Sequence, residues 1–174
     1  LSHTRARSAA TEAGARGATL PGITEDVFAT GLDADYEQIA AHCEDVLAQV
    51  ADADEVRVTT DLGTDITFEA GEREWLADTG MVHDDGDFSN LPAGEVFVAP
   101  ETANGRFVVD GTMMPYERLD DDQTLAFDVE DGQVVNIEDD RIAALAAALA
   151  ADAGHVVYNL AQLGIGTNVA VTPL

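Results

Sequence analysis

One glutamate stands where a carboxylate is energetically costly. Glu95 opens an otherwise apolar strand that continues through residues 96–99, Val-Phe-Val-Ala. A charge that enters an apolar strand costs free energy unless it is paired or bound to a metal. Two interpretations follow: Glu95 is a metal ligand at the rim of a sheet, or it is a surface glutamate at the edge of a strand.

The other residue types that can do chemistry form no motif. The four histidines, at positions 3, 42, 83 and 155, are scattered, and no pair has the i, i+4 spacing of a helical zinc site. The sequence contains no Gly-x-Ser-x-Gly nucleophile elbow and no glycine loop of the kind that binds phosphate. The single cysteine, Cys43, excludes an intramolecular disulfide, and we expect it as a buried thiol on an apolar helix face.

The charge balance is strongly acidic. The 174 residues include 34 Asp and Glu against 8 basic residues, all arginine, which gives a net charge of −26. Phosphate binding needs clustered Lys and Arg, so a general nucleic-acid binder is excluded, and anionic membrane surfaces are disfavoured. No run approaches the roughly 18 apolar residues of a membrane span. Because salt screens repulsion between spread carboxylates, we predict a salt-adapted, cytoplasmic protein of a halophilic organism.

The helices and strands that must position these residues follow one another in an irregular order along the chain. Helical spacing predicts helices at residues 2–13, 24–31, 34–52 and 140–153. Thr24, Asp35 and either Asp139 or Asp140 are predicted to cap the last three of these helices. Alternating apolar residues predict strands at 56–58, 64–68, 95–99, 106–112, 124–129 and 134–137. The first two of these strands are predicted to form a hairpin, and so are the last two, which Asp131 and Gly132 connect in a type I′ turn. Residues 71–94 are predicted to be mostly loop, and the chain from Val156 onward to be extended until it reaches a loop at residues 164–168. This order predicts an α+β fold with a mostly antiparallel sheet flanked by helices.

Several segments share a recognisable order and spacing. They are Gly-Thr-Asp-Ile-Thr-Phe (63–68), Asn-Leu-Pro-Ala-Gly-Glu-Val-Phe-Val-Ala-Pro (90–100), Val-Asp-Gly-Thr (109–112) and Leu-Ala-Gln-Leu-Gly-Ile-Gly-Thr-Asn (160–168). Together they resemble the aminopeptidase T and S family of metallopeptidases, especially its archaeal leucyl aminopeptidases. The resemblance runs through most of the chain. It implies one aminopeptidase T-like domain over residues 1–174, with a helical part at 1–53 and a mixed sheet part at 54–174.

The resemblance implies a metal-dependent aminopeptidase, a hydrolase that removes N-terminal residues from peptides. In that family two divalent metals, zinc, cobalt or similar, activate the water that attacks the first peptide carbonyl. Two family glutamate ligands fall on Glu95 and Gln162; the amide of Gln162 brings no charge, so metal affinity there should drop. A glutamate that often precedes the first ligand is replaced by Gly94. The implied partners are a peptide substrate and, since family members tend to be homodimers, a second copy, with neither nucleic acid nor membrane.

Two departures keep other functions open. The family's histidine and aspartate ligands lie downstream of residues 164–168, and this sequence ends at Leu174. We therefore expect a partial or shortened form, either a fragment of a larger enzyme or a relative that has lost the site. The alternatives are a non-catalytic binding or assembly module and an iron-dependent ring-cleaving dioxygenase, because a related branch, the dihydroxypyridine dioxygenases, binds iron with downstream histidines.

Overall fold

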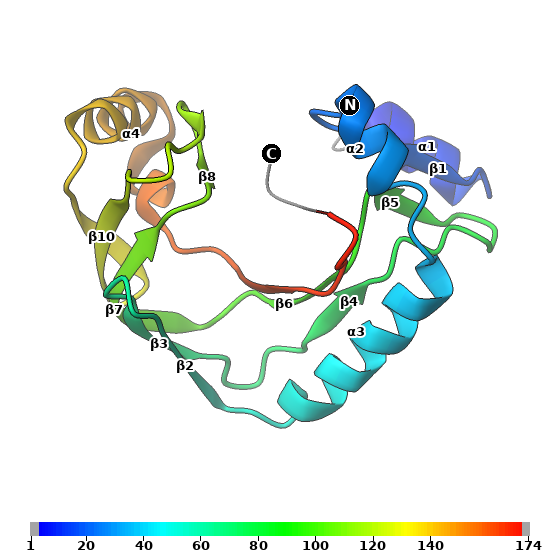
Figure 1. Ribbon diagram of the computed structural model, residues 1–174, viewed down its shortest axis with the longest axis horizontal. Helices are drawn as coiled ribbons and strands as arrows, with labels where there is room; N and C mark the ends of the chain where they lie inside the picture. The colour runs from blue at the N-terminus through cyan, green and yellow to red at the C-terminus, as the bar shows by residue number, and fades with distance from the viewer. Residues whose placement is uncertain (1–3, 172–174) are drawn as a thin grey trace. The chain divides into compact units, whose positions relative to one another are not determined.

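The structure, a computed structural model, describes residues 4–171 and has the predicted α+β class (Figure 1). The helices are α1 (Arg5–Glu12), α2 (Glu25–Thr30), α3 (Tyr36–Val50), α4 (Asp140–Ala153) and the 3-10 helix η1 (Gly154–Tyr158). The strands in the first hundred residues are β1 (Gly17–Thr19), β2 (Glu55–Thr59), β3 (Asp65–Glu69), β4 (Leu76–Asp78), β5 (Phe88–Asn90) and β6 (Glu95–Val98). The later strands are β7 (Thr102–Val109), β8 (Thr112–Met113), β9 (Glu117–Arg118), β10 (Leu125–Glu130), β11 (Gln133–Ile137) and β12 (Leu163–Gly166).

The α-helices begin where capping side chains satisfy their first backbone N–H groups. Thr24 caps α2 by accepting a hydrogen bond from the N–H of Val27 at 3.2 Å. Asp35 caps α3 in the same way, and Asp139 caps α4. These three caps are at predicted positions, because Ser, Thr and Asp side chains favour the residue before a helix.

The described residues form two compact units. Unit 1 contains residues 4–51, 75–97 and 164–171, and unit 2 contains residues 52–74 and 98–163. The N-terminal residues thus fold with two later segments, because β1 pairs in parallel with β5. A single aminopeptidase T-like domain over residues 1–174 stays a prediction.

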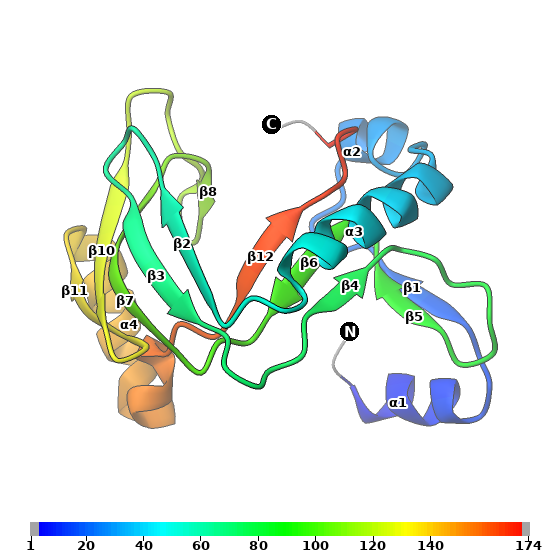
Figure 2. The same cartoon turned by 90° about the horizontal axis from the view of Figure 1, so that it is seen from below.

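Unit 1 packs α3 against a small sheet. Its three strands lie in the order β12-β6-β4, and β4 and β6 are antiparallel. Figure 2 shows α3 lying along these strands. Cys43 is fully buried, and its Sγ lies 3.1 Å from the Thr167 Oγ1, which confirms the predicted buried thiol. Trp75, 5% exposed, also lies in the interior.

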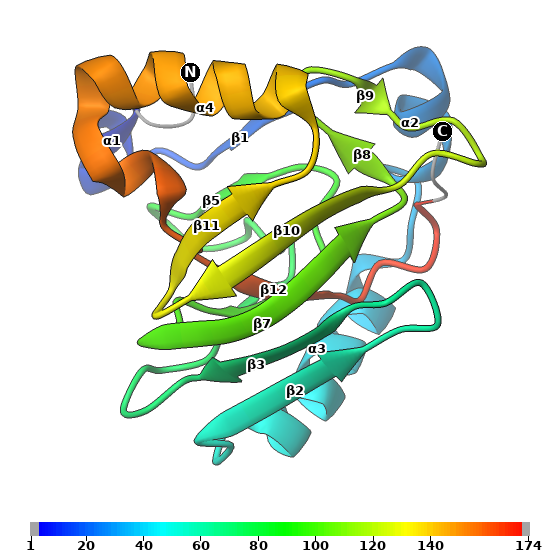
Figure 3. The ribbon, with the colours of Figure 1, turned by 90° about the vertical axis from the view of Figure 1, so that its left-hand side faces the viewer.

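Unit 2 is built on a five-stranded antiparallel sheet, in the order β11-β10-β7-β3-β2 (Figure 3). Its two predicted hairpins are present, and the turn at Asp131 and Gly132 has φ values of 48° and 75°. Both angles are positive, as a type I′ turn requires. One face of the sheet is apolar, with Ile66 and Val129 almost completely buried. Burying a side chain of this size stabilises a fold by about 1.5–3 kcal/mol.

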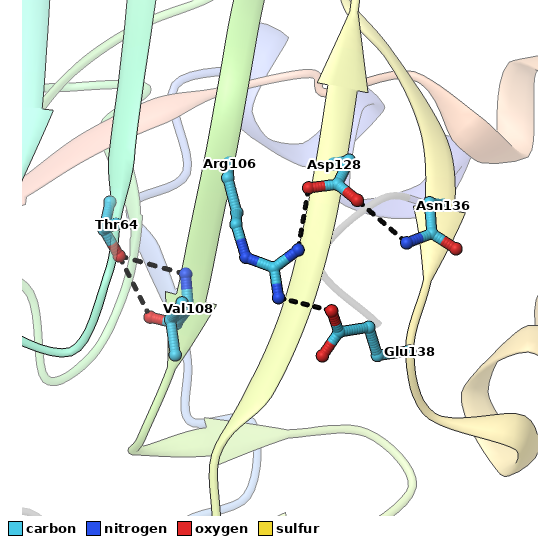
Figure 4. A network of polar contacts seen from close by, with 6 residues as sticks. All are labelled: Thr64, Arg106, Val108, Asp128, Asn136 and Glu138. Atoms are coloured by element: carbon cyan, nitrogen blue, oxygen red, sulfur yellow. Dashed lines mark hydrogen bonds and ion pairs between the residues drawn. The ribbon is translucent and has the colours of Figure 1, made fainter.

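The opposite face of this sheet carries a charged network (Figure 4). Arg106 donates to the Asp128 Oδ1 at 2.9 Å and also to Glu138. The Asn136 side chain donates to the Asp128 Oδ2 at 2.8 Å. Hydrogen bonds lower the pKa of Asp128, and the one from Asn136 contributes more than the one from Arg106. The network neutralises part of the acidic surface of unit 2.

Some expected boundaries are wrong. Residues 71–94 are mostly loop, as predicted, and also contain β4 and β5, three-residue strands too short for an alternating pattern to be visible. The chain after α4 turns through η1 instead of becoming extended at Val156, because the helix end at Gly154 has a positive φ and continues into a 3-10 turn. Residues 164–166, expected as loop, belong to β12.

One stretch, Asp140–Tyr158, is long and apolar enough by length and composition to cross a membrane. It consists of α4 and η1, and the φ of +77° at Gly154 interrupts it. The helical part has 14 residues, whereas a membrane-spanning helix needs about 20. The expectation that the protein binds no membrane and its cytoplasmic location both stay predictions.

Candidate functional site

Glu95 lies at the start of β6 in unit 1 and is half-buried. Its carboxylate rests against the backbone of Gly164 on β12, so that a methyl group added at Gly164 would overlap it. The side chain therefore occupies a fixed position beside the sheet. This placement differs from that of a strand-edge glutamate directed at bulk solvent.

The residue before it, Gly94, lies where two of the four segments that carried the family resemblance, 90–100 and 160–168, are joined by hydrogen bonds. The N–H of Thr167 donates to the Gly94 carbonyl at 2.9 Å, and the Asn168 side chain donates to the Ala93 carbonyl at 2.8 Å. Gly94 has a φ of +125°, and a Cβ at this position would lie 2.6 Å from the Asn168 Cβ. A glutamate at position 94, as is common in aminopeptidases of the T and S family, would not fit this backbone.

A second carboxylate, not predicted from the sequence, lies opposite Glu95. Asp78 on β4 is the register partner of Glu95 on β6, so both side chains lie on the same face of the sheet. The Asp78 Oδ1 accepts hydrogen bonds from the Ser89 hydroxyl at 2.9 Å and from the Gly80 N–H at 3.2 Å. Its strand lies in a segment expected to be loop, and a strand of three residues offers no periodic signal that would have revealed it.

The two carboxylates line one cavity of unit 1, which we name the Glu95 cavity. Its volume is about 450 Å³. Residues that line it include Asp78, Asn90, Pro92, Gly94, Glu95 and Asn168. The walls thus combine two acceptor carboxylates with two side-chain amides, in a space large enough for a small ring.

Tyr36 lies close to this region at the start of α3. A Cβ at Gly80 would lie 2.7 Å from the Tyr36 Cδ1, and the Tyr36 hydroxyl donates to the Gly31 carbonyl at 3.3 Å. Burial raises the pKa of Tyr36, and the Asp78 carboxylate adds to this increase. Tyr36 therefore remains a neutral hydrogen-bonding group at physiological pH.

The histidines do not gather around Glu95. His42 on α3 lies with its Nδ1 3.1 Å from the Thr167 carbonyl oxygen and is exposed. His83 and His155 are exposed at other places in the fold, and His3 lies outside the described residues. Among residues 4–171, no three His, Cys, Asp or Glu side chains are grouped so that they could hold a metal ion.

Gln162, the other predicted metal ligand, belongs to unit 2. It lies between η1 and β12 and is exposed, whereas Glu95 belongs to unit 1. A metal site made by Glu95 and Gln162 stays a prediction.

The chain was compared with known proteins. A model of the 2,5-dihydroxypyridine 5,6-dioxygenase (NicX) family matches residues 1–172. The structure of 2,5-dihydroxypyridine dioxygenase from Pseudomonas putida is similar, with a TM-score of 0.75 at 19% identity, over 95% of this chain and 48% of that one. AmpT from Thermus thermophilus has a TM-score of 0.51 at 19% identity, over 85% of this chain and 40% of that one. No curated protein sequence matches the chain.

These comparisons correct the predicted activity. The likeness to AmpT extends to the fold, but the prediction of a peptidase, a hydrolase that acts in proteolysis, is wrong, because the family model describes a dioxygenase. The fold likeness is also greater to a dioxygenase than to AmpT. The chain spans about half the length of the solved structures it matches. With a family model that matches residues 1–172, the chain belongs to the 2,5-dihydroxypyridine 5,6-dioxygenase family, a family of enzymes.

Proposed function

We propose that the protein acts in the ring-cleaving oxygenation of a dihydroxylated pyridine-type ring, and that the Glu95 cavity binds this ring. Family membership supports the reaction class. The observation that carries the binding site is the pair of carboxylates, Asp78 and Glu95, that face one cavity from adjacent strands. This proposal takes up the dioxygenase alternative that the sequence analysis left open.

The chemistry of the cavity suits such a ring. Ionised carboxylates only accept hydrogen bonds, and ring hydroxyl groups donate them. Two carboxylates on adjacent strands repel each other, so a ligand that donates a hydrogen bond to each would relieve the repulsion. Because Asp78 is held by Ser89 and Glu95 rests on Gly164, both acceptors are in place before a ligand arrives. Such preorganisation lowers the cost of binding.

The family also implies an iron ion, which in non-haem oxygenases is commonly held by two histidines and one carboxylate. The described residues do not fit this ligand set, since they bring no three suitable side chains together. As metal ligands, the oxygens of two carboxylates and two amides suit harder cations better than they suit iron. We therefore assign to Asp78 and Glu95 the binding and orientation of the ring.

A titration with 2,5-dihydroxypyridine tests the assignment. The chain has one tryptophan, Trp75, which lies three residues before Asp78, so its fluorescence and calorimetry can both follow binding. A hydrogen bond to a charged group contributes about 1.5–3 kcal/mol, so Glu95→Gln should weaken binding by roughly 10- to 100-fold. Asp78→Asn should have an effect of the same size.

The matched controls are Glu44→Gln and Asp45→Asn, exposed carboxylates of α3 that do not line the cavity. Both should bind like the unmodified chain. Absence of binding, or equal losses in the controls, would refute the site. Binding without oxygen uptake after addition of ferrous iron would favour the alternative of a non-catalytic binding module.

A further inference from the structure

An apolar groove in unit 2 is independent of the Glu95 cavity. Its volume is about 230 Å³, and both α4 and the apolar face of the sheet contribute to its walls. Residues that line it include Phe107, Phe127, Val134, Ile142, Leu145 and Leu149. Phe107 and Phe127 stack with their ring centroids 4.7 Å apart. The groove beside α4 is therefore lined by aliphatic and aromatic side chains.

Several of its apolar side chains are uncovered. Leu145 is 38% exposed, Leu149 52% and Met114 71%. Val156, on η1 just after α4, is 66% exposed. Contiguous exposed apolar surface on a protein commonly marks a binding site. This surface is notable on a chain that otherwise carries a net charge of −26.

The charges of α4 follow an order that fits a second copy of the same helix. Residues 142–151 include no charged side chain, while Arg141 precedes them and Asp152 follows. The spacing from Arg141 to Leu145 and on to Asp152 places all three on one side of the helix. All three are exposed. The exposed side of α4 therefore presents the Arg141 cation at one end, next to Asp139 and Asp140, then an apolar middle, and the Asp152 carboxylate at the other end.

We propose that α4 pairs antiparallel with α4 of a second copy across a two-fold axis. With the axis passing between positions 146 and 147, Arg141 of each copy lies opposite Asp152 of the other. Leu145 and Leu149 of each copy then cover the apolar surface of the partner. An isologous contact of this kind is self-complementary, as two-fold interfaces must be. The pairing also brings two acidic chains together along residues 142–151 of α4, which include no carboxylate.

The oligomeric state tests this pairing. At about 1 M KCl the Debye length falls to about 3 Å, so repulsion between two acidic chains is screened. Sedimentation equilibrium under these conditions should show a dimer for the unmodified chain. The double variant Leu145→Glu with Leu149→Glu should be monomeric. Leu62→Glu is the matched control, since Leu62 is 51% exposed and lies in the β2–β3 turn; it should remain dimeric.

A charge exchange tests the antiparallel register. Arg141→Asp alone and Asp152→Arg alone each break two ion pairs per dimer, which should weaken association by roughly 2- to 30-fold. The double variant with both changes restores the two pairs and should recover the dimer. Arg141 also lies over the Tyr116 ring at 4.8 Å, and this contact is lost in Arg141→Asp and in the double variant alike. Recovery by the double variant therefore reports the intermolecular pairs.

The charge-exchange measurements, unlike the sedimentation of the leucine variants, use the lowest salt at which circular dichroism shows a folded chain, because salt screens the ion pairs. A monomer at every concentration would overturn the proposal, as would a double charge variant no better than the single ones. Disruption by Leu62→Glu would overturn it too. Co-sedimentation of the unmodified chain with phosphatidylcholine vesicles, abolished by the Leu145 and Leu149 variant, would assign the apolar surface to a membrane instead.

Discussion

Replacement of Gly94 by alanine should displace the loop at residues 167–168, which packs against the residue before Glu95. The backbone at Gly94 has a φ of +125°, and an added Cβ would lie 2.6 Å from the Asn168 Cβ and 2.8 Å from the Asn168 backbone nitrogen. Backbone atoms cannot move aside as a flexible side chain can. The loop at 167–168 must therefore shift, and this weakens the hydrogen bonds from Thr167 to Gly94 and from Asn168 to Ala93.

The expected cost follows from two contributions. An alanine held at an unfavourable positive φ costs about 1–3 kcal/mol. Overpacking of a close contact costs a further 1–3 kcal/mol or so, which is about 2–6 kcal/mol in total. For a chain of this size each kcal/mol lowers the melting temperature by about 2–4 °C. Thermal unfolding followed by circular dichroism at about 1 M KCl, where charge repulsion is screened, should therefore show a loss of at least several degrees.

Gly166→Ala is the matched control, at the glycine that ends β12 directly before the loop at 167–168. A Cβ at Gly166 meets nothing within 4 Å, and its φ is not in the positive region. This variant should be as stable as the unmodified chain or slightly more stable, because alanine has fewer unfolded conformations to lose. If Gly94→Ala melts at the same temperature as Gly166→Ala, the close approach of Gly94 to Asn168 does not exist in solution.

Three further predictions concern other parts of the molecule. Hydrogen bonds from the Ile142 N–H and the Tyr116 hydroxyl hold the pKa of Asp139 below its usual value. The ionised Asp139 carboxylate therefore stabilises the fold above about pH 4, and this stabilisation is lost as the pH falls through the lowered pKa. Asp139→Asn should reduce the free energy of unfolding at neutral pH and make it less dependent on pH in acid, as measured by urea denaturation. Arg106→Gln leaves Asp128 and Glu138 without their shared cation, so its melting temperature should drop more at low salt than at about 1 M KCl. The Cys43 thiol, which is 0% exposed, should react with a thiol reagent only as fast as the chain unfolds, and rapid labelling of the native chain would contradict its burial.

Much of the fold follows from local signals that the sequence contains. Thr24, Asp35 and Asp139 cap helices because their side chains accept backbone hydrogen bonds at a helix start. Asp131 and Gly132 specify a tight hairpin because both residues tolerate positive φ. Each of these signals acts within a few residues, so no knowledge of tertiary contacts was needed to predict the element.

The candidate site depended on pairings that no local signal contains. Asp78 becomes relevant only because β4 pairs with β6 and places it opposite Glu95. The parallel pairing of β1 with β5 likewise joins residues about 70 positions apart, and it brings the N-terminal residues into unit 1. Long-range strand pairing is decided by packing across the whole unit and not by the residues of one short strand.

The incorrect prediction of a peptidase has a physical explanation in residues of the segments that carried the family resemblance. Gly94 supplies a backbone conformation, and Asn168 supplies a hydrogen bond to the Ala93 carbonyl. Both contributions stabilise the backbone of a loop and specify no reaction. Segments of this kind report the scaffold, which is similar to AmpT and more similar to a dihydroxypyridine dioxygenase. A resemblance carried by scaffold residues therefore identifies a fold more securely than a reaction.

Binding of the ring at the Glu95 cavity is tested most directly by mapping it onto the backbone. Titration of the ¹⁵N-labelled chain with 2,5-dihydroxypyridine should shift the amide resonances of Asp78, Gly94, Glu95 and Asn168, which line that cavity. The amides of Leu145 and Leu149, in the apolar groove of unit 2, should not move. Shifts confined to that groove, or no shifts at saturating ligand, would contradict the assignment of Asp78 and Glu95 as the groups that bind the ring.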